Sequence, residues 1–137
     1  MNPLDFYTNP DKLDYEKDVD SIGRDMIRKI NNSDYLRTTM YCSGHFQDEE
    51  QFPWAEGMMN LCLMALDNSK AAPKLRVALE ALRNEFGIDN VGGGILYTSA
   101  ELEGNYITSF LVEYGTKEGR QRAVDILTDI LCREESN

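Results

Sequence analysis

Hydrophobic residues along the chain follow two different periods, and the alternation between them predicts an ordered series of helices and strands. Apolar residues three or four apart indicate helices, whereas shorter runs rich in β-branched and aromatic residues indicate strands. The predicted helices span about 19–30, 69–86 and 116–132, and the predicted strands span 35–42, 91–99 and 105–114. Strict alternation in the first strand would place Leu36, Thr38, Met40 and Cys42 on one face.

Residues 57–66 fit either period. As a helix, this run would be apolar on nearly every face and would have to be fully buried. As a strand, it is a continuous apolar run between Gly57 and Asp67, which is typical of a central strand covered on both sides. We favour the strand, although a helix stays possible. The apolar side chains of this run could lie either in the core or on a dimer surface, and the pattern does not decide between the two.

Polar residues at the element ends predict where the helices begin and stop. Asp18 or Asp20 is placed to cap the first helix, Ser69 the second and Thr116 the third, and Gly87 ends the second helix. With 57–66 as a strand, the order becomes α-β-β-α-β-β-α. This order predicts a single α+β domain over 1–137, with a sheet of about four strands and helices mainly on one side. Residues 1–17 predict an irregular arm.

The composition narrows the class of protein. Of 137 residues, 42% are hydrophobic and 28% charged, as in ordinary globular chains. No apolar run reaches the roughly 20 residues that span a bilayer, and the first residues lack the features of a secretory signal. Three cysteines without a Cys-x-x-Cys pair argue against a disulfide framework or a thiolate zinc site. We therefore expect a cytoplasmic protein that makes no membrane contact.

The formal charge of −10 bears on partners. Such a surface repels phosphate backbones, so nucleic acid is an unlikely partner. The same charge permits a basic protein partner, a local basic pocket or mimicry of DNA, and its simplest role is solubility.

The first candidate site is the turn Cys42-Ser43-Gly44-His45. A cysteine becomes a nucleophile when a nearby base makes it a thiolate, and histidine is the usual partner. Because Cys42 and His45 are three residues apart across a glycine, they can meet, and an acid on the following loop can orient the imidazole. The alternative is an inward-packed cysteine with a solvent-exposed histidine. With only cysteine, histidine and carboxylates on offer, we expect no metal here.

Two further groups are candidates. The run Gly92-Gly93-Gly94 allows close approach of a ligand to the backbone, but a strand follows it, so a bulged strand entry explains it equally well. Aromatic and acidic residues around the first turn form a candidate partner-binding surface, although cross-strand pairing and simple solvation also explain residues of these types. Its members are Tyr41, Trp54, Asp48, Glu49 and Glu50.

The segment 29–45, Lys-Ile-Asn-Asn-Ser-Asp-Tyr-Leu-Arg-Thr-Thr-Met-Tyr-Cys-Ser-Gly-His, resembles the N-terminal signature of the wybutosine-synthesising tRNA methyltransferases. That signature places Ile-Asn before Asp-Tyr, then a Thr-Thr strand and Ser-Ser-Cys-Ser-Gly-Arg. Here Met40 and Tyr41 replace the two serines, and His45 replaces the arginine. The resemblance implies S-adenosylmethionine as cofactor and a modified guanosine in tRNA as substrate. The family's function would carry over at Thr39, Cys42, Ser43 and Gly44, and of these Thr39, Ser43 and Gly44 are the candidate cofactor-binding residues.

Three hypotheses of function follow. The first, which we favour, is a small acidic binding or regulatory module that contacts a protein or a small ligand. The second is an enzyme related to the wybutosine methyltransferases, in which the turn at 42–45 and the glycines at 92–94 line one cofactor pocket. The third is an acidic mimic of DNA that inhibits a nucleic-acid-binding protein. The cofactor and the partner are otherwise unknown, and a homodimer stays open.

Overall fold

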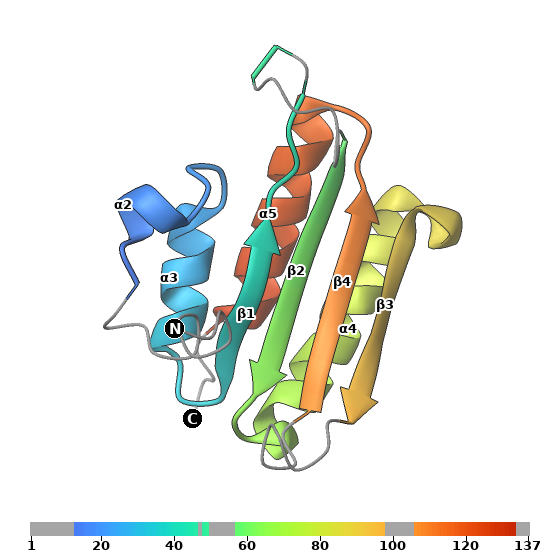
Figure 1. Cartoon of the computed structure of the whole chain (residues 1–137). Coiled ribbons are helices and arrows are strands. Elements are labelled where there is room, and N and C mark those ends of the chain that lie inside the picture. Colours follow the sequence, from blue (N-terminus) through green and yellow to red (C-terminus); the bar gives the residue numbers. More distant parts are fainter. Residues whose placement is uncertain (1–12, 47, 50–56, 98–105, 134–137) are drawn as a thin grey trace.

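The computed structural model describes residues 13–46, 48–49, 57–97 and 106–133 and shows an α+β fold built on one antiparallel sheet (Figure 1). The strands are β1 (Leu36–Cys42), β2 (Met58–Ala65), β3 (Val91–Tyr97) and β4 (Tyr106–Glu113), in the spatial order β1-β2-β4-β3. The helices are α2 (Tyr15–Asp18), α3 (Arg24–Asn32), α4 (Asn68–Phe86) and α5 (Lys117–Leu131). The predicted fold class is confirmed.

The longer helices gather on one side of the sheet. In Figure 1, α4 and α5 lie behind the strands and α3 flanks β1. The core between these layers consists of fully buried side chains from sheet and helices, among them Leu61, Phe110, Leu82 and Leu127. In the described part of the chain, no helix is long and apolar enough to span a bilayer.

The helix ends follow capping chemistry that is mostly local. Thr116 caps α5 by accepting a hydrogen bond from the Gly119 N–H, and Gly87 ends α4 at φ +91°, as the sequence predicts. The predicted cap of α4 is wrong by two residues. Asp67, not Ser69, is the N-cap, and its carboxylate accepts from the Ser69 N–H.

The first long helix begins later than its apolar pattern suggests. Neither Asp18 nor Asp20 caps it, because α3 starts at Arg24 with Gly23 as its N-cap at φ +82°. A side chain at Gly23 would also overlap the Tyr41 hydroxyl. The described part of the predicted irregular arm contains the short helix α2, and residues 1–12 lie outside the described residues.

The ambiguous run at 57–66 forms the strand β2, between β1 and β4. Met59, Leu61 and Leu63 are buried on the face that the helices cover. Met58, Asn60 and Cys62 point to the opposite face and are half-buried. The helices therefore cover one side of this strand, whereas the sequence pattern predicts cover on both.

A β-bulge interrupts β1. Thr38 pairs with Leu63 and Met40 pairs with Cys62, so Thr39 is an extra residue without an opposite partner. The predicted alternation is wrong beyond this point. The buried side chains are those of Leu36, Thr38 and Tyr41, whereas Met40 is 42% exposed and Cys42 is half-buried on the opposite face.

Candidate functional site

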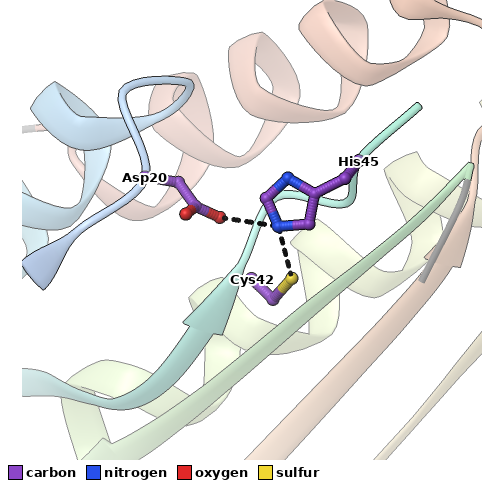
Figure 2. A group of neighbouring side chains, drawn as sticks. All are labelled: Asp20, Cys42 and His45. Atoms are coloured by element: carbon purple, nitrogen blue, oxygen red, sulfur yellow. Dashed lines mark hydrogen bonds and ion pairs between the residues drawn. The ribbon is translucent and has the colours of Figure 1, made fainter. Parts of the chain in front are cut away.

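Three chemically reactive side chains meet at the end of β1 (Figure 2). Cys42 is the last residue of β1, His45 follows it in a turn, and Asp20 comes from the loop between α2 and α3. The Cys42 Sγ lies 3.6 Å from His45 Nε2, and the Asp20 Oδ2 lies 3.9 Å from that same nitrogen. One sulfur, one nitrogen and one carboxylate oxygen thus lie within 4.8 Å of one another.

The turn that returns His45 toward Cys42 depends on Gly44. This residue has φ +89°, a conformation that residues with a side chain rarely adopt. A Cβ at this position would also overlap the Tyr114 hydroxyl and the Met58 carbonyl oxygen. The Tyr114 hydroxyl donates to the Ser43 carbonyl at 2.8 Å, so the chain just beyond β4 holds the turn in place.

Ser43 fixes the position of Asp20. Its backbone N–H and its hydroxyl both donate to Asp20 Oδ2, at 2.9 and 3.0 Å. Ser43 itself is only 2% exposed, so this pair of bonds is anchored in the interior. The Tyr41 hydroxyl donates to the Ile22 carbonyl at 2.8 Å and ties the segment after Asp20 to the same strand.

The bulge in β1 decides where the thiol points. Without the bulge, with Thr39 paired as a regular strand residue, Cys42 would share the buried face of Leu36 and Thr38. With it, Cys42 lies on the face away from the helices, opposite Asn60, where His45 and Asp20 reach it. Bulges often re-aim side chains next to functional sites, and this one has that effect on Cys42.

Arg120 of α5 supports the turn from below. Its side chain is only 5% exposed, and its guanidinium donates to the Gly44 carbonyl at 3.0 Å and to both carboxylate oxygens of Glu49 at 2.7 and 2.6 Å. It also lies 5.1 Å from the centroid of the Phe46 ring. The hydrogen bond from Arg120 lowers the pKa of Glu49 from 4.5 to about 2.

Of the acidic loop, Asp48 and Glu49 pair with cations and are not the acid next to the imidazole that the sequence predicts. Glu49 binds Arg120, and Asp48 forms an ion pair with Lys117. Asp20 takes the place beside His45 instead. Glu50 and Trp54 lie outside the described residues.

The remaining predicted partner-binding and cofactor-binding residues near this turn have structural roles. Tyr41 is 8% exposed, and its ring belongs to the core rather than to a contact surface. Thr39 is the half-buried bulge residue, and Ser43 and Gly44 are buried where they shape the turn.

The three glycines at 92–94 lie at the opposite edge of the sheet. Gly92 pairs with Leu111, which pairs with Asn60, which pairs with Cys42. Three strand spacings, about 14 Å in total, therefore separate the glycines from the thiol. The two segments predicted to line one cofactor pocket, 42–45 and 92–94, therefore lie at opposite edges of the sheet. Gly93 has a packing reason, since a Cβ there would lie 2.9 Å from the Ser109 carbonyl oxygen.

The Cys42 thiol and the Asp20 carboxylate approach the same nitrogen of His45, and this arrangement helps to distinguish a catalytic triad from a metal site. In a nucleophilic triad, the thiol contacts one ring nitrogen and the acid orients the imidazole through the other. Here Cys42 and Asp20 converge on His45 Nε2. Ligands of a tetrahedral zinc ion are about 3.6 Å apart for sulfur and nitrogen and about 3.4 Å apart for nitrogen and oxygen. The observed separations of 3.6 and 3.9 Å are close to these values.

Sequence reasoning missed Asp20 and Arg120. Asp20 lies 23 residues before Ser43, which holds it, and Arg120 lies 76 residues after Gly44. The local pattern gave Asp20 a capping role and gave Arg120 no role. The only hint in the sequence is the turn itself, because a cysteine next to a histidine suggests that a charged residue elsewhere in the chain supports them.

Comparisons with protein-family models, with curated proteins and with solved structures find no significant match for this chain. The interpretation of the site therefore depends on its geometry.

Proposed function

We propose that this protein is a small binding module whose ligand is a divalent transition-metal ion, Zn²⁺ in the first place, held by Asp20, Cys42 and His45. The observation that carries the proposal is the approach of Sγ and Oδ2 to the same imidazole nitrogen. A cation between the three atoms explains why sulfur, nitrogen and oxygen gather at one point.

The chemistry of the three ligands suits Zn²⁺. Thiolate, imidazole and carboxylate are the groups that zinc takes in proteins, and each binds it in the deprotonated form. One thiolate and one carboxylate balance the two positive charges of the ion. The net charge of −10 also raises the local concentration of cations around the chain.

The ligand set leaves room for an exchangeable group. Within the described ranges, no fourth histidine, cysteine, aspartate or glutamate joins the three. Three protein ligands with one open position are typical of zinc sites that bind a further ligand, whereas structural sites use four. His45 and Asp20 have side chains that are 18% and 31% exposed, so solvent reaches the site.

A cobalt titration tests the proposal, because Co²⁺ binds in place of Zn²⁺ and reports its ligands by colour. We expect a thiolate-to-cobalt charge-transfer band in the near ultraviolet that Zn²⁺ abolishes by competition. Cys42→Ser is expected to remove the band, and His45→Gln and Asp20→Asn to weaken binding by about tenfold or more. The matched control is Cys62→Ser, since Cys62 is a half-buried strand cysteine outside the cluster.

Two outcomes would overturn the metal site. One is the absence of a charge-transfer band in the wild-type protein. The other is a band of equal strength in Cys42→Ser. If either result came with fast alkylation of Cys42 that depends on His45, the nucleophile interpretation would replace the metal.

The alternative of an S-adenosylmethionine-dependent enzyme stays an expectation of the sequence resemblance. Calorimetry with S-adenosylmethionine tests it separately. Micromolar binding of S-adenosylmethionine to the metal-free protein would favour the methyltransferase hypothesis over the metal-binding module.

A further inference from the structure

A groove lies near the start of β1, whereas Cys42 ends that strand. It has a volume of about 1070 Å³ and is formed by residues from α3, α4 and α5 and by the residues just before β1. Its volume is close to the upper end of the range of about 300–1,000 Å³ that is typical of small-molecule sites. We call it the basic groove, after the four cationic residues that line it, Lys29, Lys70, Lys74 and Arg133.

The charges in the basic groove are not balanced. Asp34 pairs with Lys70 at 3.7 Å, and Asp129 pairs with Arg133 at 2.8 Å. Lys29 forms no ion pair with any residue in the described part of the chain, and the polar contacts of Lys74 there are to uncharged groups. Two positive charges thus lack a carboxylate, in a chain with 24 acidic residues and 14 basic ones.

These two lysines come from different helices and line the same groove. Lys29 belongs to α3 and Lys74 to α4, while Cys132 follows α5. Burial raises the pKa of the Cys132 thiol, and the charges of both lysines act against that rise. Lys29, Lys74 and Cys132 all line the basic groove, so both ammonium groups contribute positive charge to it.

The floor of the basic groove is partly aromatic. Tyr35 is only 9% exposed, and its hydroxyl donates to the Leu131 carbonyl at 2.6 Å. The Lys74 Nζ lies 2.9 Å from the Tyr35 hydroxyl and 4.7 Å from the ring centroid, and it also donates to the Arg133 carbonyl at 2.7 Å. These contacts hold the Lys74 ammonium group in a fixed position in the groove.

From this arrangement we infer that the basic groove binds a small organic phosphate monoester, with the phosphate at Lys29 and Lys74 and the organic group in the remaining volume of the groove. Lysine is a common phosphate ligand, and a dianion matches two uncompensated ammonium groups. The volume exceeds what a bare phosphate needs. The groove and the metal site are independent, since none of Asp20, Cys42 and His45 lines the groove.

Chemical-shift titrations of the ¹⁵N-labelled full chain test the inference, with phenyl phosphate, inorganic phosphate and phenol as the probes. We expect saturable shifts around 32–35 and 128–133 with phenyl phosphate, weaker binding of inorganic phosphate and none of phenol. Lys29→Gln should lower the affinity for phenyl phosphate about fivefold or more. Lys29 is exposed and makes no hydrogen bond within the described residues, so this variant is expected to fold normally.

Lys74→Gln should lower the affinity for phenyl phosphate at least as much. The loss of the hydrogen bond from Lys74 to the Arg133 carbonyl also affects the end of α5 in this variant. The matched control is Arg76→Gln, because Arg76 is exposed on the same helix and does not line the groove. Three results would overturn the inference. They are no saturable shifts at the groove, equal affinities of Lys29→Gln and the wild type, and equal affinities for phenyl phosphate and inorganic phosphate.

Discussion

The two edges of the sheet make an instructive comparison. The β1 edge ends in a turn around Gly44, and the β3 edge carries Gly92, Gly93 and Gly94. Both look like ligand-binding glycine segments in the sequence. At the β1 edge, side chains from three distant parts of the chain contact the turn, namely Asp20, Tyr114 and Arg120. At the β3 edge, the glycines are exposed and pair with β4 through the backbone.

The contrast between Gly44 and Gly94 shows which contacts distinguish a glycine at the candidate site from a glycine in an ordinary strand. Gly44 is required by a positive φ and by the atoms around it, and those atoms belong to groups that hold His45 and Ser43. Gly94 has open space where a side chain would be. A glycine therefore indicates a site where long-range contacts converge on it, and its local sequence does not reveal which case applies.

The largest effect is expected for Gly44→Ala. A left-handed φ in a residue with a side chain, together with overlap with Tyr114 and Met58, should lower the free energy of unfolding by about 3–4 kcal/mol. Urea unfolding measures this loss, and cobalt binding should disappear with it. Tyr114→Phe in the same chain should restore part of the stability by removing the overlapping hydroxyl. A loss below about 1 kcal/mol would show that the turn is not braced as described.

Arg120→Met is expected to have the next largest effect. It removes the charged donor to the Gly44 carbonyl and leaves that buried oxygen without it, which should cost about 2–3 kcal/mol. Because the turn positions His45, Zn²⁺ affinity should fall by about tenfold. Arg122→Met is the control on the same helix, since its side chain is 61% exposed and its pair with Glu85 should be worth less than about 1 kcal/mol. Equal losses in the two variants would contradict a special role for Arg120.

The ion pair of Glu49 predicts a smaller, pH-dependent effect. Its pKa is lowered from 4.5 to about 2 in the folded protein, mainly by the hydrogen bond from Arg120. The pair therefore stabilises the fold fully above about pH 4.5, and this contribution disappears as the pH falls toward 2. Partial exposure limits it to about 1 kcal/mol.

Urea unfolding of the wild type and of Glu49→Gln across this pH range isolates the contribution from the other carboxylates. The gap in stability should close between pH 4.5 and about 2. A gap that stays constant at every pH would contradict the role of the Glu49 charge. Asp48→Asn is the comparison at an exposed pair and should show less change, because Asp48 is 67% exposed.

The smallest effect is expected at the β3 edge. Gly94→Ala should change the free energy of unfolding by no more than about 0.5 kcal/mol, because a Cβ there meets no atom within 4 Å. Cobalt binding should be unchanged. A large loss in either measurement would mean that the two edges are more alike than the contacts indicate.

The parts of the fold that the sequence predicts are those that depend on neighbouring residues. The element order, the cap at Thr116 and the stop at Gly87 all follow from local pattern and capping chemistry. The proximity of Cys42 and His45 is of the same kind, since one glycine turn joins them.

The parts that it misses depend on distant contacts. Asp20 looks like a helix cap until Gly23 takes that position and Ser43 binds the carboxylate. Arg120 looks like a surface cation of an amphipathic helix, yet its guanidinium is buried under the turn. No local pattern distinguishes these roles, because each is decided by a partner elsewhere in the chain.

The bulge at Thr39 makes the chemistry of this protein depend on the pairing register of a short segment. If Thr39 paired with Cys62 in place of Met40, the two sides of the strand would be exchanged from that point on, and Cys42 would fall opposite the buried residue Met59. The sulfur would then face the hydrophobic interior, and a tyrosine would face outward. Deleting Thr39 instead removes the extra residue and keeps Tyr41 opposite Leu61 and Cys42 opposite Asn60, so the thiol should stay on its side of the sheet. The metal site should therefore tolerate the loss of the bulge residue better than a register in which that residue is paired.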